Sequence, residues 1–309
     1  MMNNKPLVSV LLISMNHEKF IEQATYSILN QTYKNFEVIF LDNNSKDKTF
    51  EIADALFKKS KINYLGIKNT ENKGVSENLN ILVQNAKGTF ISILSGDDWY
   101  ELENIEKRMN YLIANDLDVI LADGYKFLEQ KKKRKDAYSK KRKLKVINTI
   151  HDYFNVNLVD NITCNVGFLT KREILLEHPF DTSLHTEDWD INLRLSKAGY
   201  KFGFLNYKTF NYRILNTSLS HNVTLMRQSF LRVTEKNIEE IKSNPAHFKK
   251  YNMRLLDFDI SELKNKENRS KSEIAKLHHL QLQFNDLKYK GLKKKFKNFI
   301  LNMKNNISI

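Results

Sequence analysis

The stretch that decides the fold is Val8–Ser45, VSVLLISMNHEKFIEQATYSILNQTYKNFEVIFLDNNS. Residues 7–13 are a short β-rich apolar run of the kind that forms a buried parallel strand. Apolar side chains then recur at helical spacing over residues 18–30, and a second apolar run follows at residues 36–41. This stretch therefore predicts a strand, a helix and a second strand in succession.

The same alternation continues along the chain. A helical pattern covers residues 47–59, and strand-like runs at residues 62–67 and 89–94 flank a further helical pattern at residues 75–86. Parallel strands joined by helices imply an α/β fold, with helices on both faces of a mostly parallel sheet.

Polar clusters follow three of the predicted strands. They are Ser14–His17, Asp42–Ser45 and Ser95–Asp98. Ligands of such sheets bind beyond the carboxyl ends of the strands. Three polar clusters at one sheet edge therefore predict a binding site.

Composition limits the class of protein. The chain has 309 residues, of which 41% are hydrophobic and 28% charged, as in ordinary globular proteins. The single cysteine, Cys164, rules out an intramolecular disulfide. The polar start, Met1–Pro6, does not resemble a signal peptide, and the longest apolar run, residues 7–15, is shorter than the ~20 residues of a membrane-spanning helix. We therefore expect a cytoplasmic protein.

The net charge of +14 is unevenly distributed. Lys131–Lys145 holds ten basic residues and one acid, and Leu287–Ile309 holds no acid at all. Such runs are either solvated surface charge or sites of attraction for anionic lipid or a phosphorylated acceptor. Because no basic motif is interleaved with aromatic residues, we expect no nucleic-acid partner.

The last part of the chain differs in pattern from the rest. We place a soft boundary near residues 222–230, between a domain of residues 1–225 and a basic, mostly helical region of residues 226–309. An apolar stripe in that region lies opposite a lysine-rich face, as in a basic amphipathic helix. It predicts packing on its own domain or a partner, or peripheral binding at the inner face of the plasma membrane; a homo-oligomer is also left open. The stripe comprises Phe284, Leu287, Leu292, Phe296, Phe299, Ile300 and Met303.

An ordered set of motifs resembles one enzyme family, the inverting family 2 glycosyltransferases of bacteria. After Val8–Ser45 come NKGVS at residues 72–76, LSGDDWY at residues 94–100, HTEDWDINLRL at residues 185–195, and Tyr212-Arg213. The resemblance implies a GT-A fold, which is a Rossmann-like α/β fold, and transfer of sugar from a nucleotide diphosphate donor.

The resemblance implies a metal site for Mn²⁺ or Mg²⁺ after the strand at residues 89–94. A divalent cation neutralises the leaving diphosphate, and both ions prefer carboxylate oxygen. Asp97 matches the last acid of the family motif, whose first acid is replaced by Ser95. Asp98 is expected either to assist or to cap a following helix together with Glu101. His221 is a further candidate metal ligand.

Inversion requires a base that takes the proton of the acceptor hydroxyl. Asp188 of the Glu187-Asp188 pair matches the base of the family, and a neighbouring carboxylate raises proton affinity. The alternative is an acidic N-terminus of the helix that follows.

Further residues are expected to contact the nucleotide, with a UDP-sugar favoured. Asn43 stands where the family often has a second Asp, and Leu79 stands where it has an Arg, beside the matching Asn80. Arg213 is expected to close over the diphosphate. The complete set of expected donor contacts is Ser14, Asn16, Asp42, Asn43, Lys73, Asn80, Gly96, Asp97, Asp98 and Arg213.

The favoured function is transfer of one hexose or N-acetylhexosamine to a hydroxyl of a glycan or lipid-linked glycan in bacterial surface polysaccharide synthesis. Processive synthases carry a QxxRW motif and membrane spans, which this sequence lacks. Nucleotidyltransferases carry a Gly-rich basic loop near the N-terminus, which is also absent. A non-catalytic glycan-binding or scaffold protein with a degraded donor site is the alternative.

Overall fold

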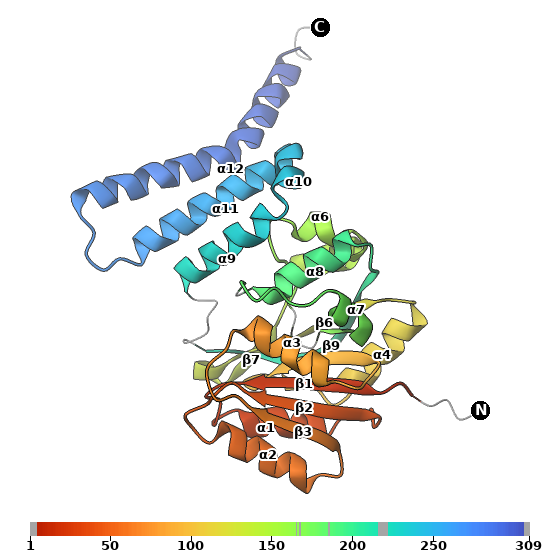
Figure 1. Ribbon diagram of the computed structural model, residues 1–309. Helices are drawn as coiled ribbons and strands as arrows, with labels where there is room; N and C mark the ends of the chain where they lie inside the picture. Colours follow the sequence, from red (N-terminus) through yellow and green to blue (C-terminus); the bar gives the residue numbers. More distant parts are fainter. Residues whose placement is uncertain (1–4, 165, 167, 185, 216–221, 306–309) are drawn as a thin grey trace. The chain divides into compact units, whose positions relative to one another are not determined.

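The computed structural model describes residues 5–164, 166, 168–184, 186–215 and 222–305, with the backbone alone from residue 290 onward. The chain forms two compact units, Met1–Ser218 and Leu219–Ile309. The first unit contains the sheet, and the second consists of helices (Figure 1).

The first unit is built on one sheet, in the strand order β3-β2-β1-β4-β8-β6-β9-β5, with β7 paired to β6. Strands β1–β4 are parallel to one another, β6 is parallel to β9, and β5, β7 and β8 pair antiparallel with their neighbours. The strands are β1 Val8–Ser14, β2 Phe36–Asp42, β3 Asn63–Lys68, β4 Phe90–Ser95, β5 Trp99–Tyr100, β6 Val119–Leu128, β7 Lys133–Asp136, β8 Leu169–Lys171 and β9 Phe202–Ile214.

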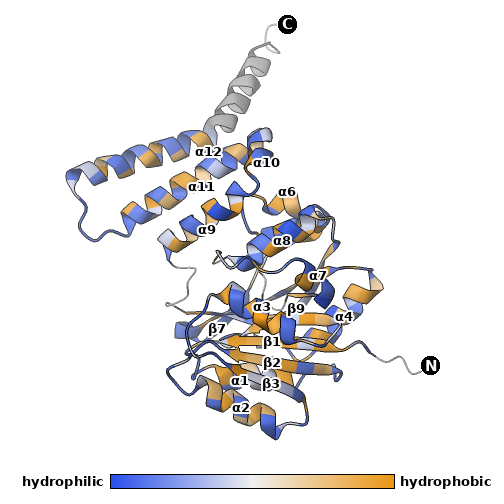
Figure 2. Ribbon diagram, in the orientation of Figure 1, coloured by the Kyte–Doolittle hydropathy of each residue, from blue (hydrophilic) through white to orange (hydrophobic). Residues whose placement is uncertain are grey.

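The core of the first unit lies on the central parallel strands. Six of the seven residues of β1 and all seven of β2 are buried, as expected of strands covered on both faces. Figure 2 shows these strands as a predominantly hydrophobic layer. The strands and helices predicted over residues 7–94 are present, and the predicted α/β class with a mostly parallel sheet is confirmed.

Helices cover both sides of the sheet. Helix α1, Ile21–Leu29, packs with α2, Thr49–Lys59, while α3, Val75–Asn85, contacts β1 and β2 on the opposite side (Figure 1). Helix α4, Asn104–Ala114, leads from β5 into β6 and contacts β6 and β9.

The second half of the unit is less regular. It contains α5 Lys140–Thr149, α6 Tyr153–Asn157, α7 Arg172–Glu177 and α8 Glu187–Lys197, with short 3₁₀ turns at Glu129–Lys131 and Ile150–Asp152. The pairing of β6 with β9 shifts register at Ala122–Gly124. Such a bulge is not readable from the sequence, because it depends on how the two distant strands meet.

The second unit is helical, as predicted. It comprises α9 Val223–Glu235, α10 Ile238–Ser243, α11 Pro245–Lys264 and α12 Lys271–Asn305. Helix α12 passes through Gly291 without interruption. Phe284 of the predicted stripe packs against a small core of Ile260, Leu263 and Leu280, which joins α11 to α12.

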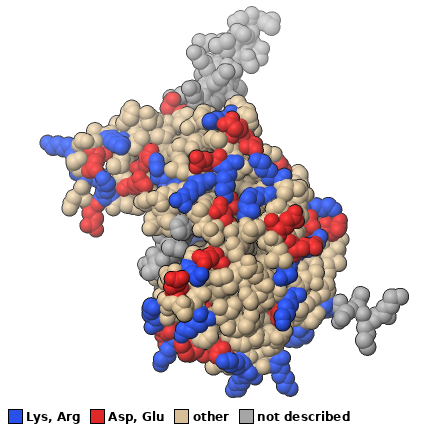
Figure 3. Space-filling view, viewed as in Figure 1, with Lys and Arg blue, Asp and Glu red and all other residues tan. Residues whose placement is uncertain are grey.

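The described surface of the second unit is mixed in charge. On the face shown in Figure 3, basic and acidic side chains are interspersed over this unit. No helix among the described residues is both long and apolar enough to cross a membrane.

Candidate active site

The three polar clusters predicted from the sequence meet at one edge of the sheet. Ser14 at the end of β1 pairs with Asp42 at the end of β2, and Ile13 pairs with Ser95 at the end of β4. The Asn43 N–H donates to the Ser14 carbonyl at 2.8 Å, and the Gly96 N–H donates to the Ile13 carbonyl at 2.8 Å. The three loops therefore leave the sheet side by side.

Gly96 lets two of these loops approach closely. A Cβ added at Gly96 would lie 2.3 Å from the Ser14 hydroxyl oxygen, so no larger residue fits without movement. Ser14 is buried, and its hydroxyl is 3.1 Å from Nδ1 of His17. Ser14 and Gly96, two of the predicted donor contacts, are thus packed against each other, and Asp97 follows Gly96 in the chain.

The two adjacent acids after β4 have different environments. Asp98 is 4% exposed, and its Oδ1 accepts the Arg213 N–H at 2.7 Å. Burial, and next the charge of Asp97, raise the pKa of Asp98 well above its usual range. Asp97 is half-buried, and its Oδ1 accepts a hydrogen bond of 2.6 Å from the Ser95 hydroxyl. Asp98 is therefore an anchor, and Asp97 is the acid presented at the sheet edge.

The alternative role of Asp98 as a helix cap is wrong. A helix capped by Asp98 would begin at Trp99, whereas α4 begins five residues later, at Asn104, with Glu103 at its N-cap. Asp98 instead leads directly into β5, and the Glu101 carboxylate accepts from Asn211 at 2.7 Å. Strand β5 and residues 101–103 therefore separate the acids from the helix, which local sequence did not indicate.

Arg213 is the centre of this anchor. Its Nε donates to the Asp97 carbonyl at 2.7 Å, one terminal nitrogen donates to Gln23 at 2.6 Å, and the other forms an ion pair with Glu129. The guanidinium also lies 4.7 Å from the centre of the Trp99 ring. All three of its nitrogens are thus engaged by protein groups.

The expected contact of Arg213 with the diphosphate stays a prediction, because the protein groups around the guanidinium already engage it. The side chain is 4% exposed and does not offer its guanidinium to a diphosphate in this structure. Its role is to fix the segment that carries Asp97 and Asp98. Gln23 and Glu129 were not identified from the sequence, since they belong to other segments of the chain and carry no local motif.

Asn16 and Asp42 shape the turns at the same edge. Asn16 has a positive φ of 56°, and its Oδ1 accepts the Lys46 N–H at 2.8 Å. Asp42 is fully buried, and its carboxylate accepts from the backbone N–H of Ser45 at 2.9 Å and from the Ser45 hydroxyl at 2.5 Å. The Asn16 bond ties the loop after β1 to the loop after β2, and the Asp42 bonds hold the turn of the loop after β2.

Asn43 is bonded on both sides of its amide. Its Oδ1 accepts the Lys73 N–H at 2.9 Å and Nδ2 of Asn69 at 3.1 Å, and its Nδ2 donates to Asn72 Oδ1 at 2.8 Å and to the Lys73 carbonyl at 2.9 Å. A carboxylate at this position would face two acceptors, which explains why an amide stands here. Asn43 therefore holds the loop of residues 69–73 against β2.

The expected contacts on α3 are also engaged with protein. The Lys73 ammonium is 2.6 Å from Glu77, and Leu79 is buried in the core. Asn80 donates to the Phe180 carbonyl at 2.9 Å and accepts the Phe180 N–H at 2.9 Å. Asn80 thus positions the segment that leads to Glu187 and Asp188.

The acidic pair at the start of α8 is half-buried. Burial, and then the charge of Asp188, raise the pKa of Glu187 to about 8. Burial also raises the pKa of Asp188. Asp188 Oδ1 accepts the Trp189 N–H at 2.7 Å, while Oδ2 has, among the described residues, a long contact of 3.5 Å to Asn161. Asp188 therefore both lies at the helix N-terminus and keeps one oxygen weakly held.

One acid of each pair affects the pKa of the Cys164 thiol. Burial, the largest cause, raises this pKa to about 11, and the negative charges of Asp98 and Asp188 raise it further. Two acids that are 90 positions apart in the chain thus both influence this thiol.

A divalent cation fits the Asp97 end of this site. The described residues contain no group of three or more His, Cys, Asp or Glu that would enclose a metal by itself. Magnesium is commonly held by one or two carboxylates together with substrate phosphates and water, which is the arrangement that Asp97 can support. His221, the second predicted ligand, lies outside the described residues.

Comparisons with known proteins agree with this architecture. The chain is 32% identical over 217 residues to an uncharacterized glycosyltransferase of Methanocaldococcus jannaschii, covering 69% of this chain and 72% of the relative. It is 33% identical over 226 residues to an uncharacterized glycosyltransferase of Rickettsia typhi, covering 70% of this chain and 65% of that relative.

Two solved structures share the fold. S. aureus TarS, residues 1–349 with UDP-GlcNAc, aligns with a TM-score of 0.61 and 16% identity over 91% of this chain and 81% of that one. The mannosyltransferase PcManGT from Pyrobaculum calidifontis, with GDP-Man and Mn²⁺, aligns with a TM-score of 0.60 and 16% identity over 93% and 85% of the two chains. The GT-A fold implied by the sequence motifs is confirmed.

The family model for glycosyl transferase family 2 matches residues 9–178, more than half of the chain. The matched region contains Asp97 and the two residues, Gln23 and Glu129, that bind the Arg213 side chain. The chain is a glycosyltransferase, and it belongs to glycosyl transferase family 2.

Proposed function

We propose that this protein transfers a single hexose or N-acetylhexosamine, with inversion, from a nucleotide diphosphate sugar to a hydroxyl of a glycan acceptor. The features that carry the proposal are Asp97, presented at the sheet edge where three loops leave the sheet, and the half-buried acid pair that opens α8 in the same unit. An inverting transferase needs diphosphate binding and a base on opposite sides of one sugar carbon.

Asp97 and Asp188 carry the two parts of this chemistry. Asp97 would hold Mn²⁺ or Mg²⁺, and the bound ion would neutralise the charge of the diphosphate. Asp188 accepts the proton of the acceptor hydroxyl through the weakly held Oδ2. Burial raises the pKa of both carboxyls of the pair, that of Glu187 to about 8, so the pair has the raised proton affinity that suits a base.

The donor-binding edge is formed by the loops after β1, β2 and β4. Side chains of Ser14, Asn16, Asp42 and Asn43 shape these loops, so their contribution to the donor is positional. We favour a UDP-sugar, and the fold-sharing structures bind UDP-GlcNAc in one case and GDP-Man in the other.

The surroundings of the reaction are proposed on the same basis. The domain of residues 1–225 carries the transfer, in the cytoplasm, as a step in bacterial surface polysaccharide synthesis. Residues 226–309 attach the protein to anionic lipid at the inner face of the plasma membrane, through the lysines that follow Leu287.

Thermal unfolding in the presence of nucleotide sugars tests the donor and metal proposals together. UDP-sugars should raise Tm only when Mn²⁺ or Mg²⁺ is present, because the diphosphate is bound through the cation. Asp97→Asn should abolish that metal-dependent shift, while Asp116→Asn, which alters an acid with 88% side-chain exposure, should retain it.

Two results would contradict the proposal. A Tm shift of equal size in the presence of EDTA would show that donor binding does not need the metal. No shift with UDP-, GDP- or TDP-sugars, with or without metal, would favour the non-catalytic glycan-binding alternative.

A further inference from the structure

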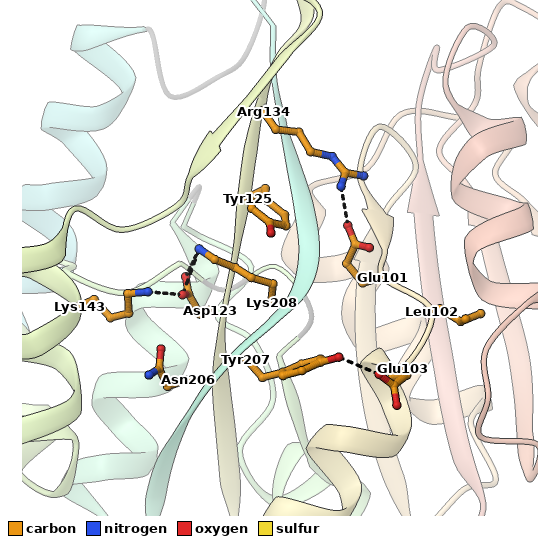
Figure 4. Close-up of a pocket in the computed structure, with 10 residues that line it drawn as sticks. All are labelled: Glu101, Leu102, Glu103, Asp123, Tyr125, Arg134, Lys143, Asn206, Tyr207 and Lys208. Atoms are coloured by element: carbon orange, nitrogen blue, oxygen red, sulfur yellow. Dashed lines mark hydrogen bonds and ion pairs between the residues drawn. The ribbon is translucent and has the colours of Figure 1, made fainter.

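A cavity of about 580 Å³ lies within the first unit, away from the loops described above. Its walls come from β6, β7 and β9, from α5, and from the segment between β5 and α4 (Figure 4). This volume lies in the range of cavities that bind drug-sized ligands. The proposed transfer reaction does not use the side chains that line it.

The charged groups of the cavity balance and bind one another. Three cations face three carboxylates, and the deepest group, the Asp123 side chain, is 2% exposed. Asp123 forms ion pairs of 2.7 Å with Lys143 and 3.0 Å with Lys208. Arg134 pairs with Glu101 at 3.1 Å, and Glu103 accepts the Tyr207 hydroxyl at 2.7 Å.

This pairing bears on the kind of ligand that fits. Lys208 also donates to the Gly124 carbonyl at 2.9 Å and pairs with Asp136 at 2.7 Å, so its ammonium is fully engaged. A cavity whose cations are already neutralised offers no excess charge to a phosphate or to a metal ion. The basic segment of residues 131–145 therefore contributes a charge-balanced wall here, in contrast to the phosphate attraction that its composition suggests.

Aromatic surface and amide groups complete the cavity. Tyr207 is 40% exposed, Asn206 is exposed, and the Tyr125 ring lies between Arg134 and Lys208, 5.3 and 4.8 Å from the two cationic centres (Figure 4). Sugar hydroxyls both donate and accept hydrogen bonds, and the C–H faces of a sugar ring pack against an aromatic ring. Neutral sugars thus match a cavity of fixed donors, fixed acceptors and tyrosine rings.

The cavity shares a wall with the segment that carries Asp97. The Arg134 guanidinium is 5.7 Å from the centre of the Trp99 ring, and Trp99 directly follows Asp98. The centre of the Trp99 ring also lies 4.7 Å from the guanidinium of Arg213. Arg213 bonds to both acids, to Asp98 through its backbone N–H and to the Asp97 carbonyl through its side chain. The lining residue Arg134 therefore contacts the residue that follows the two acids.

We propose that this cavity binds a neutral saccharide, through stacking on Tyr207 and hydrogen bonds to Asn206, Glu101 and Arg134. Its use as a site for sugar units of the glycan acceptor rests on the proposed function. Saccharide binding itself does not, because it requires neither donor nor metal.

Saturation-transfer difference NMR of the full chain, without nucleotide sugar or metal, tests the site. The probes are maltose, cellobiose and N,N′-diacetylchitobiose, with glucose 6-phosphate and inorganic phosphate as anionic comparisons. At least one neutral disaccharide should receive saturation, and Tyr207→Ala should weaken its binding at least about fivefold through loss of the stacking surface. Tyr207→Phe should retain most of the binding, because the ring remains.

Tyr26→Ala is the matched control, since Tyr26 on α1 has a similar exposure of 45% and lies outside the cavity. Its binding should equal that of the unmodified protein. Absence of binding by all three neutral disaccharides, binding of the phosphate probes alone, or equal binding by Tyr207→Ala and Tyr26→Ala would each overturn the proposal. The metal-dependent Tm shift reports on the donor site separately, so the two proposals can fail independently.

Discussion

Two segments of this chain have nearly the same sequence and are held in different ways. Asp97-Asp98-Trp99 follows β4, and Glu187-Asp188-Trp189 opens α8. In both, the tryptophan is buried, at 7% and 5% exposure, and the second acid accepts a backbone N–H at 2.7 Å. The partner of Asp98 is Arg213 of β9, whereas the partner of Asp188 is the next residue in its own helix.

This difference separates the two acids by function. Asp98 is bound from a strand 115 positions away and is sealed from solvent, so the neighbouring Asp97 is the acid that remains for a ligand. Asp188 needs only a local bond, which leaves its second oxygen with the 3.5 Å contact to Asn161. The role of an acid-acid-tryptophan motif therefore depends on which group binds its second acid.

The largest expected effect comes from substitution of Asp188, the acid that is held by a local bond. Asp188→Asn keeps the size and the N-terminal hydrogen bond but removes the base, so we expect sugar transfer to fall by about 10²–10⁴-fold. The metal-dependent Tm shift with nucleotide sugar should persist. Transfer is measured as release of free nucleotide with acceptor present, and Asp116→Asn is the control. Turnover equal to that of the unmodified protein would show that Asp188 is not the base.

The next effect tests the Arg213 side chain, which bonds to the Asp97 carbonyl, Gln23 and Glu129 while its backbone N–H bonds to Asp98. Arg213→Ala removes a buried cation and leaves Glu129 and Gln23 without it, so we expect the free energy of unfolding to fall by about 3 kcal/mol. Arg213→Lys should lose nearly as much, because an ammonium cannot reproduce the guanidinium geometry. Urea unfolding followed by circular dichroism measures both.

Lys132→Gln is the matched control for Arg213. Lys132 pairs with the same Glu129, but its side chain is 72% exposed, and such pairs contribute about 0–1 kcal/mol. Equal losses for the Arg213 and Lys132 variants would contradict the anchor role.

The smallest expected effect concerns the pH dependence of the α8 pair. Burial raises the pKa of Glu187 from 4.5 to about 8, so the folded protein binds this proton more tightly than the unfolded chain. That contribution to stability is present at low pH and is lost as pH rises from about 4.5 to about 8. Glu187→Gln should therefore gain stability relative to the unmodified protein over this range, on the order of 1 kcal/mol.

Urea unfolding of both proteins at several pH values from 4 to 9 measures the difference. Other titrating groups largely cancel between the two proteins. A difference that stays constant across this range would show that the Glu187 carboxyl is not held neutral by its surroundings.

Much of the first unit was predictable from sequence, because each of its first strands and helices is specified by residues close together in the chain. Strands β1 to β4 and helices α1 to α3 follow hydrophobic periods within single segments. The sheet edge that gathers Ser14, Asp42 and Ser95 follows from parallel strand order alone. The candidate acids Asp97, Glu187 and Asp188 were identified from two short motifs, LSGDDWY and HTEDWDINLRL, that resemble those of the family.

By itself, then, the sequence determined the α/β class, the edge that carries the site and the acids at issue, since each depends on residues close together in the chain. Tertiary structure alone decided that Arg213 is an anchor, that Asn43 and Asn80 hold loops, and that the cavity around Asp123 exists. Arg213 bonds to Gln23 across 190 positions and to Asp97 across 116. Such contacts have no local period or motif, because they depend on where distant strands meet in the sheet.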